Sequence, residues 1–410
     1  MKHNTIKKLL PFYYFLVCIF GLTQLYAESV INSNVIPSRE PVYIQMQRTA
    51  DYNGQESSIH PVWYGMNKQK KMSKKEKIDL FRTICNQMGV TENSKIPKKD
   101  SSFCRIVTYN VHFWRNPYGG WGKKNSIDFY RMFHIIYRLQ PDILILQEVG
   151  GAQQDMALEF DAECKKQGYH YTACCSTSEH GPEAPGHLYN CIISKYPFKD
   201  NPIKKQFTVN PDPSIKTQNS EQRCFVGTQI QLPNNKIVSV YGTHFEVRPI
   251  ISKNGQKQQS FTPENARKAQ LEELLKFIKD NDKNENIIIG ADFNGFRKQD
   301  LQAYSISNRS LWTIFEQNWK DLLNEMGIPA NLFHLADKEP PSFALDYIAS
   351  QGYRESFAVS GFNPPQFTTW TGTRIDFLFL SPSWNLPLEG SYVFYNWASD
   401  HIPVIMDIKL

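Results

Sequence analysis

Polar side chains that could bind a cation or transfer a proton stand at the ends of several apolar segments in this 410-residue chain. They are Asn110, Glu148, His244, Asp292 with Asn294, Asp376, and Asp400 with His401. Most stand at or just past the carboxyl end of an apolar run, and Asp376 instead lies near the start of one. Each alone could be a turn cap, a loop acid or a satisfied core histidine. Buried acids, however, repel one another and are costly to desolvate, so their gathering at one rim requires a cation or a reacting group.

The donor types narrow that cation to Mg²⁺ or Mn²⁺, because carboxylate and amide oxygens suit a hard divalent ion. A site of this kind usually keeps several waters and binds phosphate oxygens of its substrate. Zinc is disfavoured, since no H-E-x-x-H motif occurs. Glycine motifs for nucleotides and dinucleotides are missing, and so is a G-x-S-x-G elbow. These absences disfavour nucleotide-fuelled, hydride-transfer and serine-hydrolase chemistry.

Apolar patterning predicts the elements that must position these side chains. We expect strands at "CRIVTYNV", "DILILQEV", "NCIISKYPF", "KIVSVYGTHFEV", "NIIIGADFNG", "RIDFLFLS" and "IPVIMDIKL". One helix is capped by Ser126, ends at Pro141 and carries Ile127, Tyr130, Phe133 and Tyr137. A second opens at Thr262 and Pro263 and carries a stripe of Leu271, Leu274, Leu275 and Ile278. Strands that alternate with amphipathic helices predict an α/β sandwich.

The order of the motifs resembles the endonuclease/exonuclease/phosphatase superfamily. "TYNVHFW", "LQEVG", "YNCIISKYP", "YGTHFE", "GADFNG", "RIDFLFLS" and "SDHIPV" follow one another as in that group. It includes DNase I-like nucleases, abasic-site endonucleases, deadenylases, sphingomyelinases and inositol-polyphosphate 5-phosphatases. The resemblance covers roughly residues 103–410. It implies a DNase I-like α/β fold, a four-layer sandwich of two central mixed β-sheets flanked by helices, and a metal-dependent phosphoesterase.

Site roles follow from this resemblance, motif by motif. Glu148 would be the main metal carboxylate, with Asn110 beside it on the metal or the phosphate and Asp400 completing the metal shell. Asp292 would hold or deprotonate the attacking water. Asn294, two residues on, would orient that water or a phosphate oxygen.

The resemblance also implies roles for the remaining polar residues. His401 would donate a hydrogen bond or a proton to the phosphate, and Asp376 would hold its ring. His244 and Asn190 would contact the phosphate. The sequence departs from many nuclease members at His112, where they carry an acid, which leaves His112 open as a replacement contact or a structural residue.

The N-terminus is typical of a signal peptide. A basic start precedes the apolar run "LLPFYYFLVCIFGL", and Ala27 offers a cleavage point. We therefore expect a signal peptide at 1–27, an extension of unknown role at 28–100, and the catalytic domain at 101–410. The protein would be secreted or periplasmic, with no transmembrane segment once the signal is removed. An uncleaved membrane anchor is the alternative.

Charge and cysteine content constrain the partners only mildly. Removing residues 1–27, with three Lys and no acid, lowers the net charge from +6 to +3. That value permits a polyanionic partner without requiring one. Seven cysteines would remain, an odd number in an exported protein, so at least one thiol is free or paired between molecules. We expect a monomer.

The substrate stays open between two phosphate esters. A nuclease is favoured by the basic segment 68–77 and by aromatics after the first motif, Phe113, Trp114, Tyr118 and Trp121, which could stack on bases. Structural readings are the more ordinary ones: the basic segment would be the solvated start of a helix expected at about 74–89, and the aromatics would cover an edge of the core. The second hypothesis is a sphingomyelinase-like or phosphoinositide hydrolase. Export fits it, and sphingomyelinase-like members of the superfamily share the "TH" motif. A binding module with a dead site is a third hypothesis, which the complete set of polar residues opposes.

Overall fold

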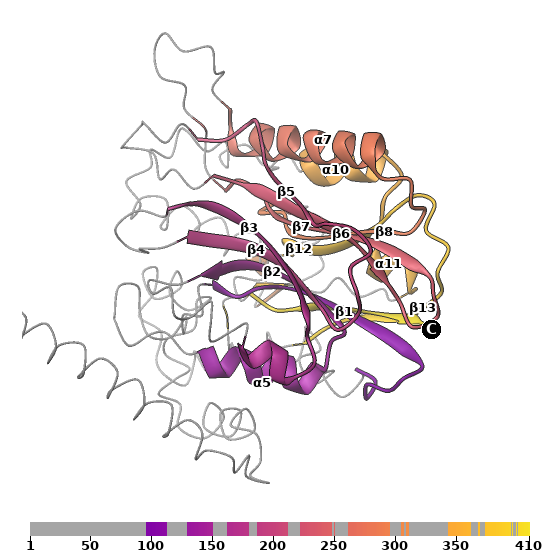
Figure 1. Ribbon diagram of the computed structural model, residues 1–410. Helices are drawn as coiled ribbons and strands as arrows, with labels where there is room; N and C mark the ends of the chain where they lie inside the picture. The colour runs from indigo at the N-terminus through magenta and orange to yellow at the C-terminus, as the bar shows by residue number, and fades with distance from the viewer. Residues whose placement is uncertain are drawn as a thin grey trace, which may run out of the picture. The chain divides into compact units, whose positions relative to one another are not determined.

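Two six-stranded mixed β-sheets face each other and form the centre of the fold (Figure 1). The computed structural model describes residues 96–112, 129–150, 162–179, 187–211, 222–247, 250, 261–295, 305–306, 309–310, 343–361, 368–369, 374–394, 396, 399 and 401–410. All of them fall within one unit of the chain, 49–410. The expected signal peptide, the basic segment, the aromatics after the first motif and Asp400 lie outside the described residues.

The first sheet has the strand order β13-β14-β1-β2-β4-β3. Its strands are β1 (Phe103–Asn110), β2 (Ile143–Gly150), β3 (Tyr171–Glu179), β4 (His187–Ser194), β13 (Leu388–Val393) and β14 (Val404–Lys409). Only β1 and β2 pair in parallel, whereas β14 runs antiparallel to β1. The chain therefore enters β14 at the same edge of the sheet where it leaves β1.

The second sheet has the strand order β11-β12-β8-β7-β6-β5. Its strands are β5 (Ile203–Gln206), β6 (Cys224–Gln231), β7 (Ile237–His244), β8 (Ile287–Asp292), β11 (Arg354–Glu355) and β12 (Asp376–Leu380). The pair β7–β8 is parallel, and β12 runs antiparallel to β8. A two-residue ladder of β9 (Ser305–Ile306) with β10 (Arg309–Ser310) stands apart from both sheets.

Apolar side chains from both sheets fill the layer between them. Ile106 and Ile145 of the first sheet share one buried cluster with Val226, Val240 and Ile288 of the second. Because these strands are covered on both faces, their sequences are nearly continuous apolar runs. The sheets are thereby held face to face, which brings their edges together as well.

Helices cover the outer faces. Helix α7 (Pro263–Asn281) and helix α10 (Phe343–Ser350) lie over the second sheet, and α5 (Phe129–Leu139) lies on the far side of the first (Figure 1). Leu271 and Leu274 of α7 pack with Ile289 and Phe379 of the sheet in a second buried cluster. A one-turn helix, α11 (Ser356–Val359), follows β11. The arrangement confirms the expected DNase I-like sandwich of two mixed sheets between helices.

Several details differ from the sequence expectations. Strands β3, β5, β6 and β13 were not expected, and β3 and β6 flank the strands that were. The apolar stripe proposed for the first helix is wrong at Tyr137, which is 56% exposed, whereas Phe133 is buried. Apolar periodicity places Tyr137 on the same face, but a tyrosine keeps its hydroxyl hydrated at little cost. Ser126 and Ile127 lie outside the part of the chain that the structure describes.

One disulfide joins neighbouring strands of the first sheet. Cys174 of β3 and Cys191 of β4 are direct register partners, and their Cα atoms lie 4.2 Å apart. Cys104, Cys164, Cys175 and Cys224 are buried and not disulfide-bonded. No helix among the described residues is long and apolar enough to cross a membrane.

Candidate active site

The polar residues singled out in the sequence converge at one edge of the two sheets. Asn110, His244 and Asp292 are the last residues of β1, β7 and β8, and Glu148 lies near the end of β2. Because β1–β2 and β7–β8 are parallel pairs, these ends meet at the same edge within each sheet. The facing of the sheets then brings the two edges together.

Antiparallel pairing explains why Asp376 and His401 belong to the same edge, although Asp376 begins its strand and His401 precedes its own. Asp376 opens β12 and is the register partner of Asp292, which ends β8. His401 precedes β14, which runs antiparallel to β1. The start of each of these two strands is thus placed where its neighbour ends.

A β-bulge directs Glu148 into the site. The register between β2 and β4 shifts between Leu146 and Val149, so Glu148 falls in the bulged segment. Its φ of 54° is left-handed, which costs a non-glycine residue about 1 kcal/mol or more. His112 and Asn294 are left-handed too, with φ of 43° and 47°. Three of these uncommon conformations lie at one edge, which is where strained backbone often serves to aim functional side chains.

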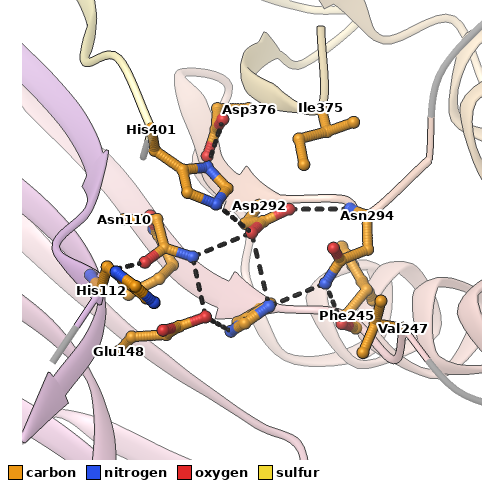
Figure 2. Close-up of polar contacts among 12 residues, drawn as sticks. Asn110, His112, Glu148, Phe245, Val247, Asp292, Asn294, Ile375, Asp376 and His401 are labelled. Atoms are coloured by element: carbon orange, nitrogen blue, oxygen red, sulfur yellow. Dashed lines mark hydrogen bonds and ion pairs between the residues drawn. The ribbon is translucent and has the colours of Figure 1, made fainter. Parts of the chain in front are cut away.

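Asp292 is the centre of the hydrogen-bond network in Figure 2. Its Oδ2 accepts a hydrogen bond from Asn110 Nδ2 at 2.9 Å and lies 3.4 Å from His244 Nε2 and 3.7 Å from His401 Nε2. Its Oδ1 accepts the backbone N–H of Asn294 at 2.8 Å. The carboxylate is buried, so its orientation is fixed from several sides.

Burial raises the pKa of Asp292 from 3.8 to about 6, and the negative charge of Asp376 adds to the increase. His401, the Asn110 hydrogen bond and the Asn294 N–H act in the opposite direction. A carboxylate whose pKa approaches neutrality is suited to accept a proton from water. The negative charge of the Asp292 carboxylate is fixed in place but only partly neutralised by its protein neighbours. A carboxylate in this condition is suited to act beside a bound cation.

Asp376 and His401 form an aligned pair. Asp376 Oδ2 lies 2.9 Å from His401 Nδ1, so the carboxylate accepts from Nδ1–H and leaves Nε2 directed toward Asp292. Thr368 fixes the backbone at both members of the pair. Its Oγ1 accepts the N–H of Asp376 at 3.0 Å, and its carbonyl accepts the N–H of Ile402, the residue after His401, at 2.7 Å. The ring is therefore fixed in one orientation with its outer nitrogen toward the site.

His244 and Asn294 form a second aligned pair. Asn294 Nδ2 donates to Phe245 O at 3.0 Å, which fixes the amide nitrogen, and the same atom lies 2.7 Å from His244 Nε2. Because Nδ2 is a donor, Nε2 is the accepting nitrogen and the proton resides on Nδ1. Nδ1 lies 3.7 Å from Glu148 Oε1. His244 thus links Glu148 of one sheet to Asn294 of the other.

Asn110 bridges the two acids. Its Nδ2 donates to Glu148 Oε1 at 3.1 Å and to Asp292 Oδ2, while its Oδ1 accepts the N–H of His112 at 3.0 Å. The amide therefore presents its nitrogen to the site. Ser399 locks the backbone behind it: Ser399 Oγ donates to Asn110 O at 2.9 Å and accepts the N–H of His401 at 3.1 Å.

The residues present fit a hard divalent cation. Asp292, Asp376 and His401 each offer a ligand atom, and these atoms lie within 4.8 Å of one another. Asp376 Oδ1 is buried with no hydrogen-bond partner among the described residues. Glu148 adds a third carboxylate next to Asp292 through Asn110. Oxygen donors that carry excess negative charge in a buried setting suit Mg²⁺ or Mn²⁺.

Asn190 lies apart from this network in its contacts. Its buried Nδ2 donates to Cys224 O at 2.9 Å, which ties β4 to β6 across the sheets. It stands on β4 between the register partners of Leu146 and Val149, hence opposite the bulge that carries Glu148. Its role toward phosphate stays a prediction, as does that of Asp400, which lies outside the described residues.

Sequence reasoning missed two residues that assemble the site, Ser399 and Thr368. Ser399 belongs to the "SDH" motif, and a hydroxyl two residues before a functional histidine is a recognisable backbone-capping signal. Thr368 lies in a loop whose sequence carries no comparable signal. Its role follows only from the fold, in which Thr368 binds the start of β12 in one sheet and the residue after His401, just before β14, in the other.

The chain is similar to several solved structures and matches one family profile. In sequence, no curated protein matches the chain. Similar solved structures include an endonuclease/exonuclease/phosphatase from Beutenbergia cavernae (17% identity, 75% of this chain and 72% of that chain, TM-score 0.48). The endonuclease/exonuclease/phosphatase from Bacteroides vulgatus has 13% identity and a TM-score of 0.43, and the match covers 76% of this chain and 100% of that chain. Beta toxin from Staphylococcus aureus has 18% identity and a TM-score of 0.42, and the match covers 74% of this chain and 98% of that chain. The profile of the Endonuclease/Exonuclease/phosphatase family matches residues 108–401, and the chain belongs to this family.

Proposed function

We propose that the protein is an exported phosphoesterase that depends on Mg²⁺ or Mn²⁺ and hydrolyses phosphodiester bonds by attack of water. The observation that carries the proposal is the convergence on Asp292 Oδ2 of Asn110, His244 and His401, three nitrogens within 3.7 Å. A base and several nitrogen groups around one point are what in-line hydrolysis of a phosphate ester requires. Membership of the family supports this reaction class.

Asp292 is proposed as the base that orients and deprotonates the attacking water. Its pKa of about 6 places it between an ordinary carboxylate and neutrality. Asn294, whose backbone N–H fixes Asp292 Oδ1, keeps the carboxylate aligned. The proton taken from water would reside on Asp292 Oδ2 until solvent removes it.

His401 is proposed to stabilise the charge that develops on the phosphate. Asp376 accepts from Nδ1–H, so a protonated ring directs Nε2–H toward the site. His244, which lies on the opposite side between Glu148 and Asn294, would contact another oxygen. Asn110 presents a donor nitrogen, which favours its predicted contact with phosphate over its predicted place on the metal.

Glu148 is the proposed principal metal ligand, with Asp400 as its predicted companion. The group of Asp292, Asp376 and His401 is the other place where the described residues could hold a cation. A bound divalent ion would neutralise phosphate oxygens and lower the pKa of a nearby water. The excess of buried negative charge at this edge supports such a requirement.

A nucleic acid is the proposed substrate. The support comes from the sequence, where the basic segment 68–77 favours a polyanion and the net charge of +3 without residues 1–27 permits one. A phospholipid is the second candidate, supported by the Thr243–His244 pair that sphingomyelinase-like members of the superfamily share. Export is supported by the apolar N-terminal segment and by the Cys174–Cys191 disulfide, because disulfides persist in oxidising compartments.

A panel assay of the purified protein tests the proposal. Plasmid DNA, RNA, sphingomyelin, a phosphoinositide and bis(p-nitrophenyl) phosphate are incubated side by side with Mg²⁺ or with EDTA. We expect cleavage of nucleic acid and of the small diester in Mg²⁺ and none in EDTA. Cleavage of lipid alone would replace the nuclease proposal with the lipid one, and no cleavage under any condition would indicate a binding module.

A further inference from the structure

We propose that Arg267 and Gln270, on the buried face of α7, are positioning residues that hold the turn after β7 and thereby align His244 and Asn294. The inference rests on the proposed function and adds two residues that position the catalytic side chains without being catalytic themselves. Both bind the backbone of Glu246, the residue after Phe245. The carbonyl of Phe245 in turn accepts a hydrogen bond from Asn294 of the site.

Gln270 holds the turn from one side. It is fully buried, its Oε1 accepts the N–H of Glu246 at 3.0 Å, and its Nε2 donates to Val209 O at 2.8 Å. One side chain thus joins the turn after β7 to the segment after β5. Both hydrogen-bonding ends of the amide are used, so the side chain has one satisfied orientation.

Arg267, three residues before Gln270 on α7, binds the same segment after β7. Its Nη1 donates to Glu246 O at 3.1 Å, so the N–H and the C=O of a single residue are both bound from α7. Its guanidinium also lies against the turn after Asn294, since a Cβ at Gly295 would come within 3.5 Å of Nε. Burial lowers the pKa of Arg267, while the charges of Glu264, Glu246 and Asp292 raise it. Asp292 is therefore within electrostatic reach of this cation.

The held turn is the part of the backbone to which the site is attached. Asn294 Nδ2 donates to Phe245 O (Figure 2), and the same nitrogen lies 2.7 Å from His244 Nε2. Asn294 N in turn binds Asp292 Oδ1. A shift of the turn would move the Asn294 amide, and with it the nitrogen that fixes the tautomer of His244.

The composition of α7 argues against a purely structural role. Its buried face is otherwise apolar, with Leu271, Leu274, Leu275 and Ile278 packed on the sheet. Buried polar side chains cost free energy unless every group is bonded, and an apolar residue would fill the same space at lower cost. The two polar exceptions meet the same backbone residue, next to the site.

Isosteric replacement separates hydrogen bonding from packing. Gln270→Met and Arg267→Met keep most of the volume, and Lys276→Met on the exposed face of the same helix is the matched control. With bis(p-nitrophenyl) phosphate and Mg²⁺ at a temperature where all variants are folded, we expect kcat to fall about 10- to 100-fold for the first two. KM should stay within roughly twofold and the control should match the wild type. Unchanged kcat in both variants would overturn the inference.

A double-mutant cycle tests whether the effect passes through Asn294. In an Asn294→Ala background the positioned amide is already gone, so Gln270→Met should reduce kcat by less than roughly twofold. A structural role would instead give the same fold-loss in both backgrounds, and that result would overturn the inference.

Hydrogen exchange provides a readout that does not need activity. In EDTA, Gln270→Met should speed amide exchange at residues 244–247 and 292–294 while the rest of β7 and β8 stays protected. Exchange that is unchanged there, or that increases uniformly over the sheet, would contradict the inference. If the wild-type protein hydrolyses no substrate, the proposed function fails, and this measurement still decides the positioning role.

Discussion

At the scale of single residues, the site depends on two histidines that are each held by one partner and each have Nε2 within 3.7 Å of Asp292 Oδ2. Asp376 fixes His401 through Nδ1, and Asn294 fixes His244 through Nε2. The two rings therefore present different atoms: His401 directs Nε2 toward Asp292, and His244 directs Nδ1 toward Glu148. The pair is not interchangeable, and the partners should matter nearly as much as the rings.

Replacing Asp376 by Asn tests this dependence. Asn has nearly the same shape, but it carries no charge to stabilise a protonated His401 ring. We expect Asp376→Asn to lower kcat about 10²- to 10⁴-fold, the range that general acid–base groups contribute. Steady-state kinetics with a soluble diester measure the loss, and Asp346→Asn on α10 is the control. A loss below threefold would show that the pair does not assist the reaction.

Asp292 gives a prediction for stability in the absence of metal. Its folded-state pKa, about 6, lies above the ordinary 3.8, so its contribution to stability is fully present below about pH 4 and is lost as the pH rises through 6. In EDTA at pH 8, Asp292→Asn should therefore be more stable than the wild type by roughly 1–3 kcal/mol. The difference should vanish near pH 4. Urea unfolding at both pH values measures it, and a variant that is less stable at pH 8 would contradict the burial argument.

At the scale of elements, two glycines let the sheets approach closely just beneath the site. Gly242 of β7 and Gly290 of β8 are register partners, each two residues before His244 or Asp292. Both face Ile145 of β2: a Cβ at Gly290 would lie 2.5 Å from Ile145 Cδ1, and one at Gly242 would lie 2.8 Å from Cγ2. The side chain of Ile145 thus occupies the space that Cβ atoms at Gly242 and Gly290 would need.

Gly290→Ala should push the sheets apart at this point. We expect a loss of about 1–3 kcal/mol of stability from overpacking and a lower kcat, because Glu148 comes from β2 and Asp292 from β8. Ile145→Val, which removes the nearest methyl, should restore part of both in the double variant. Thermal unfolding and kinetics of the two single variants and the double variant measure the coupling. Additive losses would show that the contact with Ile145 does not limit the approach.

The elements also show how far the sequence predicts the site. The convergence of Asn110, Glu148 and Asp292 was predictable, because buried parallel strands end at one edge. The place of Asp376 was not explained, since it depends on the antiparallel pairing of β12 with β8. The aim of Glu148 could not be predicted, because a bulge is a property of register with β4.

Other features depend on contacts between distant segments. The disulfide Cys174–Cys191 requires β3, a strand that apolar patterning did not reveal, and its register with β4. The orientation of the Asn110 amide is set by the N–H of His112, whose own conformation is left-handed. His112 thus has a structural contact at the site, one of the two readings that its sequence position left open.

At the scale of the whole molecule, the site concentrates negative charge where the two sheets meet. Asp292, Asp376 and Glu148 lie in one network, and the charge of Asp292 acts on Arg267 of α7. Such a charge excess lowers the stability of the metal-free protein. A ligand that binds only the folded state would restore it by mass action.

Mg²⁺ should therefore stabilise the fold. At a concentration about 100 times the dissociation constant, binding adds about 2.7 kcal/mol to the unfolding free energy. Thermal unfolding with and without Mg²⁺ should show a higher Tm in the wild type and a much smaller increase in Glu148→Gln. The control Glu285→Gln alters an acid outside the site, and we expect Mg²⁺ to raise its Tm as much as that of the wild type. A full increase in Glu148→Gln would move the metal to the Asp292, Asp376 and His401 group.

The Mg²⁺-dependent rate of phosphodiester hydrolysis tests the proposed active site most directly. It is measured in wild type, in His401→Ala and in the control His170→Ala, each shown to be folded by circular dichroism. We expect the wild type and His170→Ala to hydrolyse bis(p-nitrophenyl) phosphate at equal rates in Mg²⁺ and not in EDTA. His401→Ala should lose about 10²- to 10⁴-fold in kcat. Near-normal turnover by His401→Ala, or undiminished hydrolysis by the wild type in EDTA, would contradict the proposed metal-dependent mechanism.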